Sequence, residues 1–597
     1  MRARLPVASA LVLACLIGPS DRAACAEAGG GDLAAARELF ERNLEAIRRR
    51  DRDAYLACYL ESDRLARTGP AGTELGFSSH AEQSRSSPWP DLFEALDLRL
   101  VPVAPGVVYG TYRYRVLYGA EEHSGLSERI FLRTDGGWRI AVTSAFDAPP
   151  GIPPPPRALV GATLIDGTGA APIPDSVVLI RAGRIECAGG RSLCRIPEGV
   201  ERLDLTGRWI APGLIDAHVH FSQTGWADGR PDALDVRKKH PYEETQARLR
   251  ERPDVRFRAY LCSGVTGVFD VGGYPWTWSL RERSESDSGA PRVAAAGPLL
   301  STLDHWLNLP AEKQLLDVPD EKSARDGVAY LAAHRTSAVK IWLIVQPGAD
   351  MAALESVVKA AGEEARARGV PLIVHATGLA EAKVALRAGA RLLVHSVEDQ
   401  AVDDEFVRLA LSNRTIYCPT LTVGRGYLRM FSAAASSKAP DLDDPLGCTD
   451  EETRARIAET AEYGRAIEPE RLGRRAERVD RAEAVMAGNL KKLHEAGVPI
   501  AMGTDAGNPL TMPGASVFAE MEAMQAAGLS PMEVLVAATR GGAEAMGRLE
   551  DLGTIEPGKW ADLIVLDADP AASVSNLRRL RYVVKGGVVR ASGAASN

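Results

Sequence analysis

The chain has 597 residues, of which 45% are apolar and 25% are charged. This is ordinary globular composition, and the length is too great for a single hydrophobic core, so we expect two or more domains. The net charge is −8, from 71 basic and 79 acidic residues. Because the two signs are interleaved, the sequence excludes the basic surface of a nucleic-acid-binding protein and favours a small molecule or dipeptide as substrate.

Residues 1–26 have the pattern of a secretory signal peptide. Arg2 and Arg4 precede the apolar run 5–17, and Ala24-Cys25-Ala26 offers a cleavage site. The run is too short to span a membrane, and no later apolar stretch is long enough, so we expect no transmembrane segment. We expect a periplasmic or secreted protein cleaved near Ala26. A cytosolic protein with a poorly ordered N-terminus and a lipoprotein anchored at Cys15 are the alternatives.

The chain has 8 cysteines but no C-x-x-C pair, which argues against a cysteine zinc site. Cys187 and Cys194 flank a glycine-rich turn and could form a disulfide in an oxidising compartment. Cys418 and Cys448 could tie down the irregular segment between them. Free, buried thiols are the alternative for both pairs.

Six prolines between 149 and 156 mark a stiff linker, residues 148–157, that separates a small part from a large part. The small part, residues 32–147, begins with helical patterns. Strand-like runs follow, and the turn Asp135-Gly136-Gly137 predicts a hairpin. The helical patterns lie at residues 34–50 and 53–60, and the strand-like runs at 98–103, 107–118, 127–134 and 138–143.

Helices followed by an antiparallel sheet make the small part resemble the NTF2-like (SnoaL-like) α+β cone, a fold that encloses a pocket. The resemblance lies in the pattern of elements alone. Its polar candidates are His80, His123 and Asp63, and each fits a surface or turn position better than an acid–base pair.

The large part predicts an α/β fold. Residues 158–212 and 553–592 are rich in strands and are expected to form one composite β-sandwich. Between them, in residues 213–552, near-continuous apolar runs alternate with helical patterns, which is typical of buried parallel strands and predicts a (β/α)₈ TIM barrel. Residues 424–475 are expected to be a partly helical insertion over its mouth. The predicted strands are residues 215–220, 265–271, 293–297, 338–345, 371–375, 392–395, 415–419 and 499–503.

Polar residues end or interrupt these apolar runs at six positions. His218 and His220 are two residues apart at the end of the first run, so alternation puts both imidazoles on one side. A barrel brings the ends of its strands together, so we expect these side chains to meet. The positions are His218, His220, Lys340, His375, His395 and Asp505.

Four imidazoles and a carboxylate suit Zn²⁺ or a similar divalent cation. Lys340 is unusual, because a lysine in an apolar strand is rarely buried without a partner. Burial and metal charge favour the neutral amine, which can react with carbon dioxide to give a carbamate able to bridge two cations. Taken singly, each residue has a structural alternative: a satisfied core histidine, a snorkelling lysine or a helix-capping aspartate.

Several stretches together resemble the amidohydrolase superfamily over residues 157–591. They are residues 209–220, the strand with Lys340, the two strands that end in a single histidine, residues 503–507 and residues 552–563. The resemblance implies that two divalent metal ions share a hydroxide that attacks the substrate.

The same resemblance assigns the roles. His218, His220 and Asp505 would hold the more buried ion, and His375 and His395 the other. Lys340, carboxylated by carbon dioxide, would bridge the two. Asp505 would also be catalytic, taking the proton and delivering it to the leaving nitrogen.

The position of the bridging lysine resembles the prolidase-like and Xaa-Arg dipeptidase-like branch, which implies cleavage of a dipeptide or N-acyl amino acid. Those relatives often carry a tyrosine where this chain has Ala376. Arg425 could pair with a substrate carboxylate in its place. The candidate substrate-binding residues are His240, His305, Arg425 and Tyr427.

Two other functions stay open. One is a single-metal deaminase or cyclic-amide or lactone hydrolase, as in the imidazolonepropionase-like branch, against which Lys340 argues. The other is a non-catalytic ligand-binding protein, against which the intact ligand set argues. The metal content per chain would separate these functions: two ions for the binuclear hydrolase, one for the single-metal enzyme and none for the binding protein. The substrate, the native metal and any homo-oligomer are left open.

Overall fold

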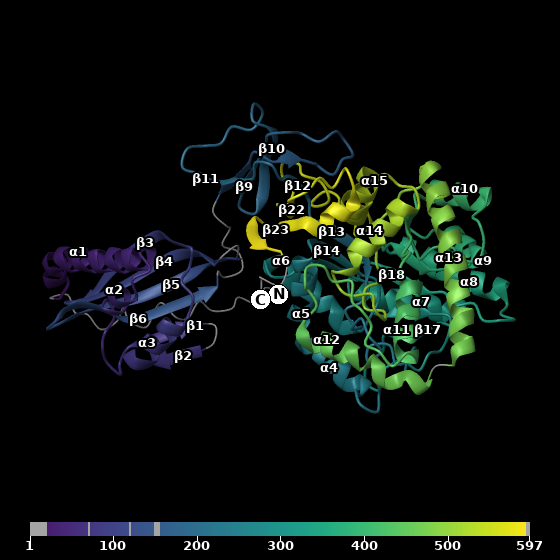
Figure 1. Ribbon diagram of the computed structural model, residues 1–597, viewed down its shortest axis with the longest axis horizontal. Coiled ribbons are helices and arrows are strands. Elements are labelled where there is room, and N and C mark those ends of the chain that lie inside the picture. The colour runs from purple at the N-terminus through teal and green to yellow at the C-terminus, as the bar shows by residue number, and fades with distance from the viewer. Residues whose placement is uncertain (1–20, 70–71, 119–120, 148–155, 467, 593–597) are drawn as a thin grey trace. The chain divides into compact units, whose positions relative to one another are not determined.

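Figure 1 shows the computed structural model, which describes residues 21–69, 72–118, 121–147, 156–466 and 468–592. Contacts within the chain divide it into two compact units, residues 1–152 and 153–597. The division falls inside the predicted proline-rich linker, most of which lies outside the described residues. The predicted signal peptide lies outside them as far as residue 20.

The first unit packs helices against a 6-stranded sheet with the order β2-β1-β6-β5-β4-β3. Neighbouring strands are antiparallel except β1 and β6, which are parallel. The elements are α1 (Asp21–Arg48), α2 (Arg52–Leu56), β1 (Ala66–Gly69), β2 (Gly72–Leu75), α3 (Phe77–Ser86), β3 (Leu92–Ala104), β4 (Val107–Tyr118), β5 (Glu121–Thr134) and β6 (Gly137–Asp147).

Alternation along β4 shows how this unit forms its core. Val108 and Tyr112 are buried, and the Phe40 ring of α1 packs edge-on against Tyr112 with 4.9 Å between centroids. The predicted hairpin is present, because Thr134 pairs with Gly137, whose φ of 98° favours glycine. The four long predicted strands correspond to β3–β6, whereas β1, β2 and α3 lack a clear apolar period and were not predicted. The NTF2-like resemblance stays a prediction.

Strands from both ends of the second unit share one core. β12 pairs antiparallel with β22, and a cluster that includes Leu159, Val178 and Val565 lies within these sheets. The sheets have the orders β10-β9-β7-β11 and β24-β23-β22-β12-β8. The strands are β7 (Arg157–Val160), β8 (Thr163–Leu164), β9 (Ser176–Arg181), β10 (Arg184–Gly190), β11 (Glu201–Asp204), β12 (Trp209–Pro212), β22 (Leu563–Leu566), β23 (Leu580–Lys585) and β24 (Val588–Ala591).

Two further sheets, β13-β14-β15 and β17-β16-β18-β19-β20-β21, are parallel throughout. All but the last of the apolar runs predicted for the barrel fall on these strands, and β16 and β17 were not predicted. The strands are β13 (Leu214–Val219), β14 (Val265–Asp270), β15 (Arg292–Ala295), β16 (Leu299–Ser301), β17 (Leu315–Asp317), β18 (Val339–Trp342), β19 (Leu372–His375), β20 (Leu392–Val394) and β21 (Ile416–Cys418).

The last predicted strand, residues 499–503, is not a regular strand. Tyr417 N donates to Pro499 O at 2.8 Å, and Ala217 N donates to Met502 O at 3.0 Å, so the segment still lies between β21 and β13. Pro499 has no backbone N–H to donate to a ladder. A single parallel bridge, between Tyr417 and Ile500, joins this segment to β21. The closed (β/α)₈ barrel therefore stays a prediction.

Helices follow most of the parallel strands, and α11 to α13 occupy the segment predicted as an insertion. A capping box begins α15: Ser530 N donates to Glu533 Oε2 at 2.7 Å, and Glu533 N to Ser530 Oγ at 3.3 Å. No helix in the described ranges is long and apolar enough to cross a membrane. The helices are α4 (Tyr242–Glu251), α5 (Pro253–Cys262), α6 (Trp278–Ser286), α7 (Glu321–Ala333), α8 (Met351–Ala367), α9 (Leu379–Arg387), α10 (Asp404–Asn413), α11 (Val423–Ala435), α12 (Glu451–Ala458), α13 (Pro469–Glu495), α14 (Ser516–Ala526), α15 (Pro531–Val536) and α16 (Gly542–Ala545).

Two disulfides lie in the second unit. Cys187 and Cys194 are bonded, which confirms that pair. The predicted pair of Cys418 and Cys448 is wrong, because Cys448 is bonded to Cys262 at the end of α5. Cys418 is a buried free thiol on β21, where its side chain packs beside the parallel strands.

Candidate metal centre

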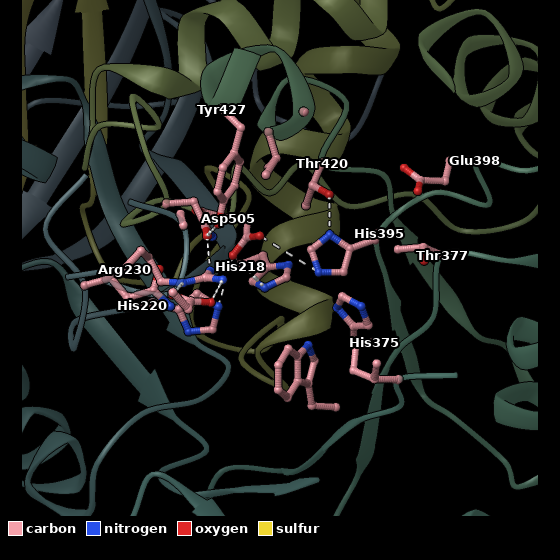
Figure 2. A pocket seen from close by; sticks show the side chains of 18 of the residues that line it. His218, His220, Arg230, His375, Thr377, His395, Glu398, Thr420, Tyr427 and Asp505 are labelled. Atoms are coloured by element: carbon pink, nitrogen blue, oxygen red, sulfur yellow. Dashed lines mark hydrogen bonds and ion pairs between the residues drawn. The ribbon is translucent and has the colours of Figure 1, made fainter. Parts of the chain in front are cut away.

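All six predicted metal-site residues line one cavity of about 540 Å³. They come from the carboxyl ends of β13, β19 and β20, from within β18, and from the segment after residue 503. Figure 2 shows His218, His220, His375, His395 and Asp505 turned toward a common space. Residues more than 280 positions apart in the chain are therefore gathered as the sequence predicts.

Asp505 lies among the imidazoles. Its Oδ1 is 3.3 Å from His218 Nε2 and 3.0 Å from His220 Nε2, and its Oδ2 is 3.9 Å from His395 Nε2. The rings of His375 and His395 are 4.4 Å apart between centroids, and those of His218 and His395 are 4.8 Å apart. One carboxylate thus contacts imidazoles from different strands.

Burial keeps three of the four imidazoles neutral. It lowers the pKa of His218, His375 and His395 well below the usual value, and the positive charge of Lys340 lowers each further. Burial also lowers the pKa of Lys340 to about 7, although the Asp505 charge opposes that shift. Neutral imidazole is the form that binds metal.

The donor set fits a divalent cation. One ligand atom each from His218, His220 and Asp505 lies within 4.8 Å of the others. Neither ring nitrogen of His218 makes a hydrogen bond, nor does Asp505 Oδ1, although all are buried. Buried polar atoms in proteins are nearly always paired, so these atoms point to a partner such as a metal ion.

Two further contacts fix the rings. His220 Nδ1 lies 2.6 Å from Gly272 O, and His395 Nδ1 lies 2.8 Å from Thr420 Oγ1. With Nδ1 engaged, Nε2 of each ring is left to face Asp505. Ligand histidines are oriented in this way at metal sites.

The backbone at the site lies in the left-handed region. His395 has φ 73°, Asp505 has φ 59° and Thr420 has φ 46°. Such conformations cost about 1–3 kcal/mol each for residues other than glycine, and they gather at functional sites. The backbone therefore adopts costly conformations at the positions that direct these side chains into the site.

Asp216 supports the site from within β13. Its carboxylate accepts from Thr504 N at 2.9 Å and from Thr504 Oγ1 at 2.6 Å, which ties β13 to the segment that carries Asp505. Burial raises the pKa of Asp216 to about 7. Gly503, the residue before Thr504, packs closely against β13 and β21. A Cβ at this position would lie 2.9 Å from His218 Cβ and 2.4 Å from Cys418 Sγ. The supporting contacts of Asp216 and Gly503 were not predicted from the sequence.

The sequence model of the amidohydrolase family matches residues 209–590, which span these ligands. This chain belongs to the amidohydrolase family. Its family membership and its imidazolonepropionase relatives make it a hydrolase acting on carbon–nitrogen bonds.

Among curated relatives, the imidazolonepropionase of Rhizorhabdus wittichii is 27% identical over 450 residues, covering 68% of this chain and 92% of its own. That of Methylobacterium nodulans is 28% identical over 439 residues, covering 68% and 91%.

Among solved structures, a candidate prolidase from Bifidobacterium longum is similar with a TM-score of 0.55 and 26% identity, covering 74% of this chain and 96% of its own. A Xaa-Pro dipeptidase with bound methionine has a TM-score of 0.55 and 23% identity, covering 73% and 100%. These similarities give the second unit an amidohydrolase fold.

The candidate substrate-binding residues divide into two groups. His305 and Tyr427 line the cavity as predicted. His240 does not, because its Nε2 lies 2.6 Å from Glu459 Oε2. Arg425 does not either, because its guanidinium donates to Glu483 at 2.9 Å and to Asp480 at 2.8 Å. The acids that engage these two side chains were too far away in the sequence to be recognised as partners.

Other lining residues were missed. They include Arg230, Glu398, Arg475, Arg478 and Asn508. Arg475 and Arg478 belong to α13, a polar helix in which no local pattern sets them apart from neighbouring arginines. Asn508 lies three residues after Asp505, and its Nδ2 donates to Asp505 O at 3.1 Å. Its closeness to Asp505 in the sequence was the signal that could have identified it as a lining residue.

Proposed function

We propose that this amidohydrolase-family enzyme is a binuclear, metal-dependent hydrolase that cleaves the amide bond of a dipeptide or an N-acyl amino acid. Lys340 is the observation that carries the proposal. It is 2% exposed and lines the same cavity as four imidazoles. Among the described residues it forms no ion pair. A buried amine in this setting needs a further role.

Carboxylation would supply that role. With its pKa lowered to about 7, much of Lys340 is the neutral amine near neutral pH. The amine nitrogen forms a bond to the carbon of carbon dioxide, a proton leaves, and a carbamate anion with two oxygens remains. An anion in place of the ammonium suits a site that also holds cations.

The residues present would hold two divalent ions. His218, His220 and Asp505 would bind one, His375 and His395 the second, and the Lys340 carbamate both. Zn²⁺ is the expected ion, because nitrogen and oxygen donors of this kind suit it. Bound ions of this class lower the pKa of water and polarise a carbonyl oxygen.

Asp505 is the proposed acid–base residue. It is the carboxylate that contacts the imidazoles, so we assign it the transfer of a proton from the attacking water to the leaving nitrogen. Its own N donates to His218 O at 2.7 Å, and Asn508 holds its carbonyl. These bonds fix the backbone that carries the carboxylate.

Arg475 is the proposed contact for a substrate carboxylate, in place of Arg425. Its guanidinium carbon lies 4.3 Å from the Phe431 ring centroid. Burial lowers its pKa, and the charge of Arg478 lowers it further. Neither Arg475 nor Arg478 forms an ion pair with an acid in the described part of the chain. An arginine held on an aromatic ring without an acid is well suited to bind a carboxylate.

A second candidate is a single-metal hydrolase of a cyclic amide. The imidazolonepropionase relatives, at 27–28% identity, favour it. In that case His218, His220 and Asp505 would hold the ion, and Lys340 would remain an unmodified amine.

Metal analysis joined to a substrate screen tests the choice. Purified full-length protein is assayed for metal per chain and for hydrolysis of dipeptides, N-acyl amino acids, cyclic amides and lactones. The proposal expects about two ions per chain and turnover of an acyclic amide that bears a carboxylate. About one ion per chain with turnover of cyclic amides alone would favour the second candidate and reject the first.

We further propose that the protein is exported, with cleavage near Ala26. The disulfides Cys187–Cys194 and Cys262–Cys448 support this, because such bonds persist in oxidising compartments. N-terminal sequencing of the mature protein from its native host tests the cleavage site, and an intact leader on the protein in the cytosol would contradict export.

A further inference from the structure

The first unit buries a cation without an acid. Arg129, on β5, is 3% exposed and lies among aromatic rings, 5.3 Å from the Phe40 centroid and 5.1 Å from that of Tyr112. Its Nη1 donates to Asn43 Oδ1 at 2.8 Å, but its Nε has no partner. In the described residues it pairs with no carboxylate. A buried charge is rarely left uncompensated.

His80 lies in the same interior. The predicted surface position of His80 is wrong, because α3 turns the side chain inward and leaves 3% of it exposed. Its ring centroid is 4.5 Å from that of Tyr59 and 5.9 Å from that of Tyr55. Neither ring nitrogen has a hydrogen-bond partner. Burial, then the charges of Arg67 and Arg129, lower its pKa to about 4, so the ring is neutral.

Neighbouring acids are already engaged. Glu74 accepts from Gln83 Nε2 at 3.1 Å and lies 3.8 Å from an Arg67 nitrogen. Glu128 accepts from the Tyr109 hydroxyl at 2.6 Å. None of these contacts reaches Arg129, so the described residues of the unit supply no carboxylate counter-ion there.

Several of the unmet buried atoms in this unit are N–H donors, whereas Glu74 Oε2 and Gln83 Oε1 are unmet acceptors. Asn43 is fully buried and uses its Oδ1 for Arg129, which leaves its Nδ2 as a donor without a partner. With Arg129 Nε and one nitrogen of the His80 ring, it gives three unmet N–H donors around a positive charge. Donors of this kind are satisfied by an anion.

We propose that the interior of the first unit binds an organic carboxylate. Arg129 and Asn43, from β5 and α1, hold the carboxylate oxygens, and His80, from α3, donates to one of them. The apolar part of the ligand lies against the rings of Tyr55 and Tyr59, whose hydroxyls are bonded to each other at 2.9 Å. This site does not depend on the metal centre or on the proposed hydrolysis.

Calorimetric titration of the full-length protein with benzoate tests the site, with benzamide as the uncharged probe of the same shape. We expect saturable binding of one benzoate per chain, about tenfold tighter than benzamide. Arg129→Met and His80→Phe should each weaken benzoate binding by about tenfold or more.

Two control variants separate this site from other arginines. Arg133, also on β5, is exposed, so Arg133→Met should bind benzoate like the parent protein. Arg475→Met, in the second unit, should do so too, which excludes binding at the metal cavity. If Arg129→Met fails to fold, His80→Phe decides. Equal benzoate binding in the parent, Arg129→Met and His80→Phe, equal binding of benzamide and benzoate by the parent, or no saturable binding of benzoate would overturn the proposal.

Discussion

Two regions of the second unit bury a lysine, and they treat its charge differently. Lys585 on β23 and Lys340 on β18 are each 2% exposed. Burial lowers the pKa of Lys585 to about 8 and that of Lys340 to about 7. Around Lys585, Asp562 accepts from Arg292 Nε and from Gly586 N, both at 2.7 Å. Both carboxylate oxygens of Asp562 are therefore hydrogen-bonded.

Around Lys340 the polar atoms are not satisfied. Both nitrogens of His218 and one oxygen of Asp505 lack hydrogen bonds. A buried lysine with a lowered pKa therefore does not by itself mark a functional site. The unmet ligand atoms beside it do, because a structural cluster such as that of Asp562 closes its own network.

Replacing Lys340 should have the largest effect. Lys340→Ala removes the proposed bridge, so metal content should fall from about two ions per chain and kcat/KM should drop by about 10³-fold or more. A small carboxylic acid such as propionate should restore part of the activity. Metal analysis and steady-state kinetics measure both. Lys585→Met is the matched control and should keep both ions; unchanged metal content and turnover in Lys340→Ala would reject the bridging role.

Breaking the satisfied cluster should instead cost stability. Asp562→Asn leaves Arg292 and Lys585 as buried cations without that carboxylate, so denaturant unfolding of the full chain should show a loss of about 3 kcal/mol. Metal content should not change. A loss of metal in Asp562→Asn, with stability intact, would mean that the two clusters do not differ as described.

His80 extends the contrast to the first unit. Its folded pKa of about 4 lies below the unfolded value of 6.5, so the unfolded chain binds the extra proton. The contribution to stability is therefore complete above pH 6.5 and is lost as the pH falls toward 4. Between pH 7 and pH 5 the loss should be about 2 kcal/mol.

Hydrogen exchange of peptides from β4 and β5 measures this dependence. Arg67 and Arg129 carry the charges that face His80, and Tyr55 and Tyr59 are its ring neighbours. His80→Phe should remove most of the acid sensitivity. The same pH dependence in the parent and in His80→Phe would show that another group is responsible.

Arg475 should have the smallest effect of the four. Arg475→Met should lower kcat/KM about tenfold for a substrate with a free carboxylate and leave its carboxamide analogue unchanged, since the ion pair alone is lost. Arg481, on the same helix with a side chain 72% exposed, supplies the control variant Arg481→Met. An equal loss for acid and amide substrates would make Arg475 a structural residue.

The sequence predicted the gathering of the metal-site residues because each interrupts an apolar run, as Lys340 does on β18. It could not predict partners fixed only in three dimensions. Arg425 and Glu483 are far apart in the chain, so their ion pair was not foreseen. His80 was misplaced because α3 shows no clear apolar period. Residues 499–503 were apolar enough for a strand, but one bridge to Tyr417 and isolated hydrogen bonds are what connect them to their neighbours.

Incorporation of carbon dioxide tests the central claim most directly. Enzyme loaded with Zn²⁺ in ¹³C-labelled bicarbonate should give one carbamate carbon signal by ¹³C NMR, and Lys340→Ala should lack it. An active, metal-loaded parent enzyme without that signal would contradict a carboxylated Lys340.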